Sequence, residues 1–106
     1  MKIIFCGYHN PHFMTVTEYA EKAIRTLGHD LITFNDADFS IPGRARTAFK
    51  PLADFDLRRL NRKLVRINKR YKPDICIVCD GYRILPESVK EIKRLGITTV
   101  LWIMDP

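Results

Sequence analysis

The chain has 106 residues, of which 46% are hydrophobic and 28% are charged, and its formal net charge is +6 at pH 7. This length suits one domain with a single core, and the balance of apolar and charged residues excludes an intrinsically disordered chain. No apolar run approaches the roughly 20 residues that a membrane-spanning helix needs. The apolar run at the amino terminus is also too short for a signal peptide, so we expect a cytoplasmic protein.

Hydrophobic periodicity switches several times along the chain, and the switches divide it into strands and helices. Short continuous apolar runs rich in β-branched residues are typical of strands covered on both faces, whereas apolar residues three or four positions apart indicate amphipathic helices. The predicted elements, in chain order, are a strand at 2–6, a helix at 16–27, a strand at 29–34, a helix at 52–72, a strand at 74–79, a helix at 86–95 and a strand at 97–104.

Several helix boundaries carry their own sequence signals. Thr15 and Glu18 have the spacing of a capping box at the start of the first helix. Gly28 and Gly96 stand where a helix commonly ends, and Pro86 suits the first turn of the last helix. These signals support the predicted bounds of the first and last helices.

Residues 35–50 show no clear period and contain Pro42 and Gly43. We therefore predict a long, mobile connection there. A structureless segment of this length is unusual in a compact domain unless it serves a function.

Alternation of strands and helices is typical of a parallel sheet covered by helices. The strands at 2–6 and 74–79 are the most apolar, and the less apolar strand at 29–34 belongs nearer an edge. We expect a single α/β domain over residues 1–106, with a four-stranded parallel sheet of order 2-1-3-4 and helices on both faces, as in Rossmann-like and flavodoxin-like three-layer domains. Because the chain stops directly after an apolar strand, we expect it to be the amino-terminal part of a longer protein.

The three cysteines, Cys6, Cys76 and Cys79, lie in or beside apolar strands. Cysteines in this setting are typically small buried hydrophobic residues in a reducing compartment. Cys76 and Cys79 match the spacing C-x-x-C, but residues three apart in a strand point to opposite faces. We therefore expect neither a redox motif nor a zinc site from this spacing.

Ligands of open parallel sheets bind beyond the carboxyl ends of the strands, where neighbouring connections leave in opposite directions. With the order 2-1-3-4, this point lies between the strands at 2–6 and 74–79. Three polar segments then converge on one rim: Gly7 to Phe13, Asp80 to Arg83, and Asp105-Pro106. This rim is the predicted site.

The first of these segments has two open interpretations. Gly7 allows close approach of a ligand, and the helix that follows presents unpaired N–H groups that favour an anion; alternatively, Gly7 only makes a turn. His9 and His12 are better suited to proton transfer or substrate hydrogen bonds than to a metal, because a zinc site needs three or four ligands.

Asp80-Gly81-Tyr82-Arg83 places a carboxylate, a glycine, an aromatic ring and a guanidinium in four consecutive residues. Such sets recognise sugars and nucleotides, although a turn with a solvated arginine has the same pattern. The candidate catalytic residues are His9, His12 and Asp80. The candidate substrate-binding residues are Gly7, Tyr8, Asn10, Gly81, Tyr82, Arg83 and Asp105.

The excess positive charge is local. Between Leu57 and Pro73 there is no acidic residue, and the basic ones are Arg58, Arg59, Arg62, Lys63, Arg66, Lys69, Arg70 and Lys72. A basic face opposite an apolar stripe is usually a solvated surface, but it also suits an anionic partner. For the helix at 52–72 such a partner is an anionic membrane surface, with the protein then peripheral to the membrane, a nucleic acid, or an acidic region of the same longer protein. Nucleic acid fits less well, because no aromatic residues alternate with the basic ones before Tyr71.

Three stretches of the sequence resemble the amino-terminal domain of CgeB-like proteins, which are spore-maturation-type glycosyltransferases. The stretches are "MKIIFCGYHNPHFMTVTEYAEKAIRTLGHD", "LNRKLVRINKRYKPDICIVCDGYRILPESVKEIKRLGI" and "TVLWIMDP". Their more specific pieces are "GYRILPE" and the terminal W-x-x-D-P, and the resemblance is weakest across residues 36–51.

The resemblance implies a GT-B architecture, in which two Rossmann-like domains face each other across a cleft. The amino-terminal domain then holds the sugar acceptor, a carboxy-terminal domain holds the nucleotide-sugar donor, and catalysis needs no metal or other cofactor. Family members often carry an acidic pair before the final proline, where this chain has Asp105 alone. Without a donor domain, we expect no glycosyl transfer from residues 1–106 alone.

The residues by themselves leave other functions open. One alternative is a stand-alone flavodoxin-like binding or regulatory module, and another is an interaction domain that uses its basic helix against a membrane. A receiver domain fits poorly because Cys6 and Gly7 end the first strand without the acidic pair that binds magnesium. A cobalamin-binding domain fits poorly because the chain lacks D-x-H-x-x-G.

Overall fold

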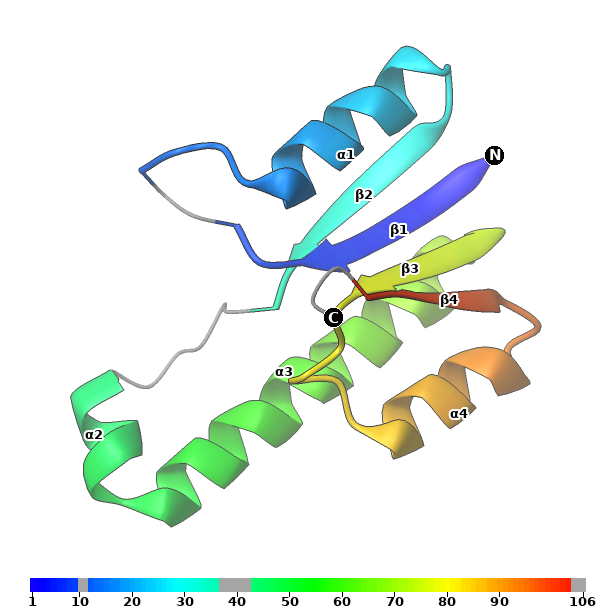
Figure 1. The fold of residues 1–106 in the computed structure, drawn as a ribbon. Coiled ribbons are helices and arrows are strands. Elements are labelled where there is room, and N and C mark those ends of the chain that lie inside the picture. Colours follow the sequence, from blue (N-terminus) through cyan, green and yellow to red (C-terminus); the bar gives the residue numbers. More distant parts are fainter. Residues whose placement is uncertain (10–11, 37–42, 104–106) are drawn as a thin grey trace.

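The computed structural model describes residues 1–9, 12–36 and 43–103 (Figure 1). Strands and helices alternate along most of the chain, as the periodicity predicts. The elements are β1 (Lys2–Gly7), α1 (Val16–Thr26), β2 (Asp30–Asn35), α2 (Gly43–Ala48), α3 (Lys50–Tyr71), β3 (Ile75–Cys79), α4 (Pro86–Arg94) and β4 (Thr98–Trp102).

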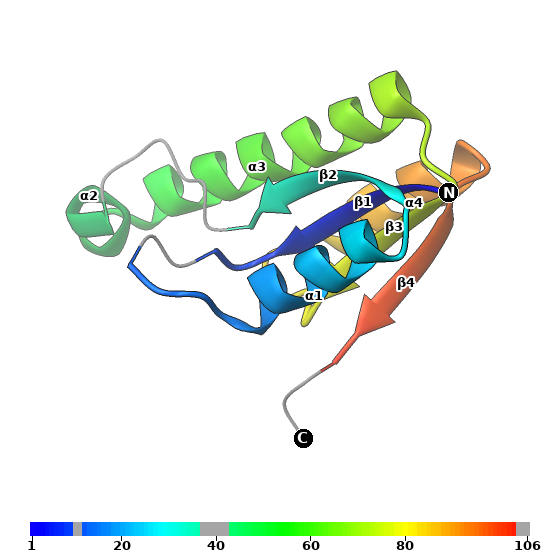
Figure 2. The same cartoon turned by 90° about the horizontal axis from the view of Figure 1, so that it is seen from above.

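The four strands form one sheet of order β2-β1-β3-β4, and every neighbouring pair is parallel. The predicted order 2-1-3-4 is therefore confirmed, including the central position of β1 and β3 and the edge position of β2. Helix α1 covers one face of the sheet, and α3 and α4 cover the other (Figures 1 and 2). The fold is a three-layer α/β domain of the Rossmann-like or flavodoxin-like kind.

The main core lies between the sheet and helices α3 and α4. Ile4, Cys6 and Cys76 of the central strands are fully buried there against Leu60 and Leu64 of α3. Side chains alternate along a strand, so the neighbours of Ile4 face the other layer. There Phe5 is 1% exposed, and its ring meets the ring of Trp102 edge-on, with centroids 6.2 Å apart.

The predicted signals at the helix ends are confirmed. Glu18 accepts a hydrogen bond from the backbone N–H of Thr15 at 2.7 Å, which completes the capping box of α1. Gly28 and Gly96 follow α1 and α4 with φ of 87° and 83°, the left-handed region that glycine adopts without steric cost. Pro86 occupies the first turn of α4.

The prediction for residues 35–50 was wrong in part, because residues 43–48 form the short helix α2 and α3 begins at Lys50 rather than near Leu52. The stretch Gly43–Ala48 has too few apolar residues to show a helical period. Phe49 alone separates this short helix from α3. Its N–H donates to the carbonyl of Ala45 at 3.0 Å. Residues 37–42 lie outside the described residues.

β4 lies at the edge of the sheet and is the least covered strand. Val100 and Leu101 are 41% and 57% exposed. The predicted strand at 97–104 is shorter in the structure, and Met104 lies outside the described residues. Among the residues that the structure describes, no helix combines the length and the apolar character needed to cross a membrane.

All three cysteines are free and buried. Cys76 lies on the α3 side, where its sulfur is 3.7 Å from Nδ2 of Asn68. Cys79 lies on the α1 side, next to Gly7 and Thr17. The two thiols of the C-x-x-C spacing therefore point to opposite faces, as predicted.

We expect the native protein to react slowly with thiol reagents. Burial raises the pKa of Cys76 to about 11 and the pKa of Cys6 well above its usual range. Because the thiolate is the reactive form, labelling at mildly alkaline pH should be roughly a hundredfold slower than for an exposed cysteine. Three thiols should react quickly after unfolding in denaturant. One thiol that reacts quickly in the native state would contradict this expectation.

Candidate functional site

The carboxyl ends of β1 and β3 are neighbours in the sheet, and their connections leave toward opposite faces. The chain passes from β1 to α1 on one face and from β3 to α4 on the other. This is the topological switch point at which open parallel sheets bind ligands. The strand order thus brings Tyr8 of the first predicted segment close to residues 80–83 of the second. Asn10, Asp105 and Pro106 lie outside the described residues.

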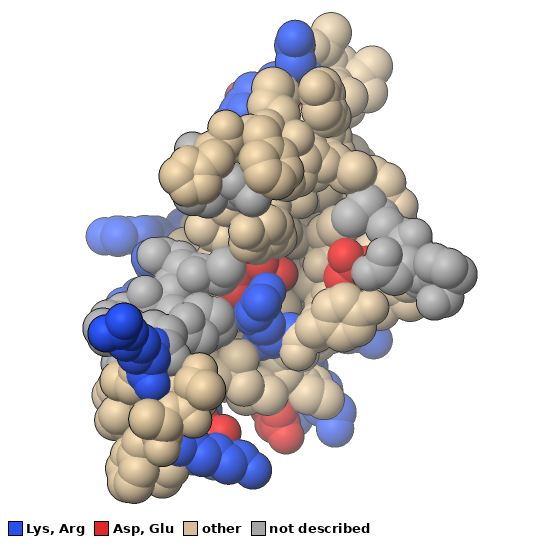
Figure 3. Space-filling model, turned by 60° about the vertical axis from the view of Figure 1, so that its left-hand side comes forward, with Lys and Arg blue, Asp and Glu red and all other residues tan. Residues whose placement is uncertain are grey.

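A hollow of about 500 Å³ opens at this point. Figure 3 brings this side of the molecule forward and shows acidic and basic side chains together around its centre. We call the residues that line the hollow the rim site: Tyr8, Thr15, Val16, Thr17, Asp36, Cys79, Asp80, Tyr82 and Arg83. Four of the sequence-predicted residues, Tyr8, Asp80, Tyr82 and Arg83, belong to it.

A sharp turn after β3 positions the second predicted segment. Asp80 and Gly81 both have left-handed backbone conformations, with φ of 64° and 76°. Aspartate tolerates this region better than most residues, and glycine adopts it freely. The N–H of Asp80 donates to the carbonyl of Trp102 at 2.8 Å, which ties the turn to β4. The chain then reaches Tyr82, which is 77% exposed at the mouth of the hollow.

Asp36 is a member of the rim site that the sequence interpretation missed. It follows β2 directly and is 6% exposed, and its Oδ1 lies 3.5 Å from Nη1 of Arg83. Burial raises the pKa of Asp36, and the charge of Asp80 acts in the same direction, whereas Arg83 and His9 act against them. The rule that parallel strands end at one edge applies to β2 as well, so this position was available to sequence reasoning.

We expect Asp36→Asn to stabilise the protein at neutral pH. Because the pKa of Asp36 is raised on folding, the native state holds this proton more tightly than the unfolded state. The free energy of unfolding therefore falls as the pH rises above 3.8, the ordinary pKa of an aspartate. The asparagine variant avoids that loss because its side chain does not ionise. The measurement is urea unfolding of both proteins across acidic and neutral pH. The gain should vanish below pH 3.8, and an equal difference at every pH would contradict the assignment.

His9 is held by two hydrogen-bond acceptors. Its Nδ1 lies 3.0 Å from the carbonyl oxygen of Gly7, and its Nε2 lies 2.9 Å from both carboxylate oxygens of Glu21. Both ring nitrogens are therefore engaged within the protein. Since the Glu21 side chain is only 5% exposed, this pair fastens the β1–α1 loop to α1. A catalytic role for His9 stays a prediction, as it does for His12, which is exposed in the same loop.

The space beside Gly7 is filled by protein. A Cβ at this position would lie 2.9 Å from Oγ1 of Thr17 and 3.3 Å from Cβ of Cys79. The missing side chain therefore lets α1 approach the ends of β1 and β3 closely. Contact of the Gly7 and Gly81 backbones with a ligand remains a prediction.

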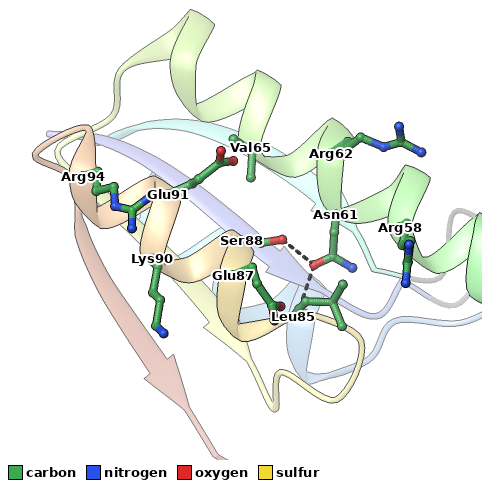
Figure 4. Close-up of a pocket in the computed structure, with 10 residues that line it drawn as sticks. All are labelled: Arg58, Asn61, Arg62, Val65, Leu85, Glu87, Ser88, Lys90, Glu91 and Arg94. Atoms are coloured by element: carbon green, nitrogen blue, oxygen red, sulfur yellow. Dashed lines mark hydrogen bonds between the residues drawn. The ribbon is translucent and has the colours of Figure 1, made fainter.

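A larger groove, of about 650 Å³, lies between α3 and α4 (Figure 4). Asn61 lines it, but its polar atoms are already bonded within the protein. Nδ2 donates to the carbonyls of Leu57 and Arg83, both at 2.8 Å, and Oδ1 accepts from the N–H of Leu85 at 2.7 Å and from the hydroxyl of Ser88 at 3.0 Å. Asn61 thus supports the loop that carries Arg83, and we place the candidate site at the rim rather than in the groove.

Comparison of the chain with protein-family models, with curated proteins and with solved structures finds no match. The resemblance to CgeB-like proteins therefore stays a prediction. Within the described residues, no three histidine, cysteine, aspartate or glutamate side chains come together as a set of metal ligands.

The chemistry of the rim site follows from its residue types. Asp36 and Asp80 offer carboxylate oxygens that accept hydrogen bonds, and Arg83 offers a guanidinium that donates them. Tyr8 and Tyr82 are 44% and 77% exposed, so their rings are accessible to an apolar ligand face. Such a set suits a small ligand that carries several hydroxyl groups.

Proposed function

We propose that the rim site binds a hydroxyl-rich ligand of the sugar class and that the chain is the acceptor-side domain of a GT-B glycosyltransferase. The observation that carries this proposal is the grouping of two carboxylates and two exposed tyrosines around one open hollow at the strand ends. Carboxylates accept hydrogen bonds from sugar hydroxyls, and aromatic rings cover the apolar faces of sugar rings. The Rossmann-like fold of the domain agrees with either half of a GT-B enzyme.

Transfer to an acceptor hydroxyl requires a base that takes the proton of that hydroxyl. Asp36 and Asp80 both line the hollow, and the raised pKa of Asp36 brings its carboxyl closer to the range in which a base works well. His9 is less suited in this geometry, because both of its ring nitrogens hold the loop in place. In this proposal the nucleotide-sugar donor is a substrate that a second domain holds.

The test of binding is a titration of the 15N-labelled chain with monosaccharides, followed by NMR. We expect shift changes at Tyr8, at Asp36 and from Asp80 to Arg83. Asp80→Asn should abolish them while the fold is retained, because asparagine also tolerates the left-handed backbone at this position. Asp30→Asn is the matched control, since Asp30 is exposed at the opposite end of the sheet.

Two results would overturn the proposal. Shift changes confined to residues outside the rim site would remove the hollow from ligand binding. Release of nucleoside diphosphate from a nucleotide-sugar by the 106-residue chain alone would contradict the acceptor-side assignment, because the proposal gives the donor site to another domain.

A further inference from the structure

Helix α2 and the beginning of α3 project beyond the carboxyl ends of the strands (Figures 1 and 2). With 22 residues, α3 is about 33 Å long, whereas β1 with 6 residues spans about 20 Å. The fully buried residues of α3 begin at Asp56. The helix therefore overhangs the sheet, and its first turns stand outside the main core.

Two large aromatic side chains are exposed on this overhang. Phe49, the residue before α3, is 57% exposed, and Phe55 in its second turn is 56% exposed. The phenylalanine side chain has no polar atom that could form a hydrogen bond with water. Two such residues at a projecting end are therefore better suited to an apolar environment than to solvent.

Helices α2 and α3 also carry exposed cations close in sequence to these phenylalanines. Phe55, Arg58 and Arg62 follow one another at helical spacing along α3, and Figure 4 shows Arg62 pointing away from α4. Lys50 and Arg44 add two more exposed cations at the start of α3 and in α2. We call these six residues the projecting tip: Arg44, Phe49, Lys50, Phe55, Arg58 and Arg62.

Acidic side chains offset only part of this charge. Among the described residues, Asp54 is exposed beside the tip, and the exposed Glu87 and Glu91 line the same groove as Arg58 and Arg62. Asp56 is fully buried, and its Oδ1 lies 3.2 Å from Nε of Arg59, so this pair carries no net charge. Figure 3 shows the corresponding gathering of Lys and Arg around uncharged side chains at the lower left, where α2 and the start of α3 lie.

We propose that the projecting tip binds the surface of an anionic membrane. Stable peripheral binding takes two signals, an apolar anchor and a basic patch, and the tip carries both. The phenylalanines enter the boundary between headgroups and acyl chains, and the cations remain at the level of the anionic headgroups. This function is independent of what the rim site binds.

The shape of the tip favours a membrane over a nucleic acid. Of the cations of the tip, Arg58 and Arg62 line the groove between α3 and α4, whereas Arg44 on α2 and Lys50 at the start of α3 do not. The larger groove between α3 and α4 also contains Glu87 and Glu91, which would repel phosphates there. A flat, anionic surface can instead meet the projecting helix from outside.

Co-sedimentation of the 106-residue chain with vesicles tests the proposal. We expect binding to vesicles of equal parts phosphatidylcholine and phosphatidylserine, weakening with added salt, and little binding to phosphatidylcholine alone. Arg58→Gln with Arg62→Gln should weaken binding about 25-fold at low salt, because each cation near an anionic surface contributes about fivefold. Phe49→Ser with Phe55→Ser should weaken it about tenfold at every salt concentration.

Matched controls lie on α1, on the opposite side of the sheet. Lys22→Gln with Arg25→Gln removes the same charge from exposed positions, and Tyr19→Ser removes an aromatic ring that is 61% exposed. These variants should bind vesicles like the unaltered chain, and circular dichroism should show all variants to be folded. Three results would each overturn the proposal. The first is an equal loss of binding in the α1 variants, and the second is equal binding to both kinds of vesicle. The third is tighter binding to a DNA or RNA oligonucleotide than to anionic vesicles.

Discussion

Replacement of Asn61 by alanine should lower the free energy of unfolding by about 3 kcal/mol, which corresponds to a fall of roughly 15 °C in Tm for a domain of this size. Asn61 is 2% exposed and makes four hydrogen bonds, of which one lies within α3 and three connect α3 to the β3–α4 loop and to α4. The alanine variant leaves the carbonyl of Arg83 and the N–H of Leu85 without this partner. Urea unfolding with an unchanged m-value measures the effect.

Asn68 provides a matched control on the same helix. It is also fully buried, but its Oδ1 has no hydrogen-bond partner among the described residues, and its Nδ2 donates to the carbonyl of Leu64 within the helix. The lost side-chain volume destabilises the Asn68→Ala variant, but removal of an unpaired buried acceptor stabilises it and offsets part of that loss. Asn68→Ala should therefore lower the free energy of unfolding by only about 1 kcal/mol. Equal losses for the two variants would show that the network around Asn61 adds nothing beyond side-chain volume.

The same substitution should also loosen the rim site. Asn61 holds the carbonyl of Arg83, and Arg83 faces Asp36 across the hollow. We therefore expect Asn61→Ala to weaken sugar binding even at temperatures at which the variant is fully folded. Asn68→Ala, whose bonds lie away from the loop, should leave binding unchanged.

Replacement of Gly7 by alanine should cost about 2 kcal/mol, because the new Cβ would overlap α1. It would lie 2.9 Å from Oγ1 and 3.0 Å from Cγ2 of Thr17, a residue that is 3% exposed and cannot easily move. In a Thr17→Ala background both of these atoms are gone, so at least half of the cost should disappear. Thermal or urea unfolding of the two single variants and the double variant gives this coupling directly.

Gly28→Ala separates steric overlap from backbone strain. Gly28 has a φ of 87°, and no atom lies within 4 Å of the position of an added Cβ. Alanine there should cost about 1 kcal/mol through the left-handed backbone alone, independently of Thr17. If Gly7→Ala were as insensitive to Thr17 as Gly28→Ala is, close packing of α1 would not be the reason for glycine at position 7.

The position of the rim site could be predicted from the sequence because it depends on strand order. The apolar runs at 2–6 and 74–79 identify the central strands, and their carboxyl ends then define the edge where Tyr8 and Asp80 lie. A strand that is buried on both faces has a continuous apolar run, and such a run can be recognised in the sequence without knowing which strands lie next to it.

The partners within the site could not be predicted in the same way. The end of β2 indicates the position of Asp36 but not its pairing with Arg83, Glu21 is a buried acid on an otherwise ordinary helix, and Asn61 lies within a run of basic residues. Each acquires its role from a residue far away in the chain: Arg83, His9 and the β3–α4 loop. The helix α2 was missed for a related reason, since a short helix beside a single neighbour needs no apolar stripe of its own.

Three features of this protein can be read from its amino-acid sequence: the alternation of strands and helices, the order of the strands, and the edge that carries the loop Gly7 to His9. They follow from hydrophobic periodicity, because burial of apolar surface drives folding more strongly than any other effect and leaves a local pattern. The pairing of His9 with Glu21, the room that Gly7 makes for Thr17 and the approach of Asp36 to Arg83 emerge only in the folded chain. Such pairings depend on distances between elements, and the sequence around a polar side chain shows no periodic pattern that identifies its partner.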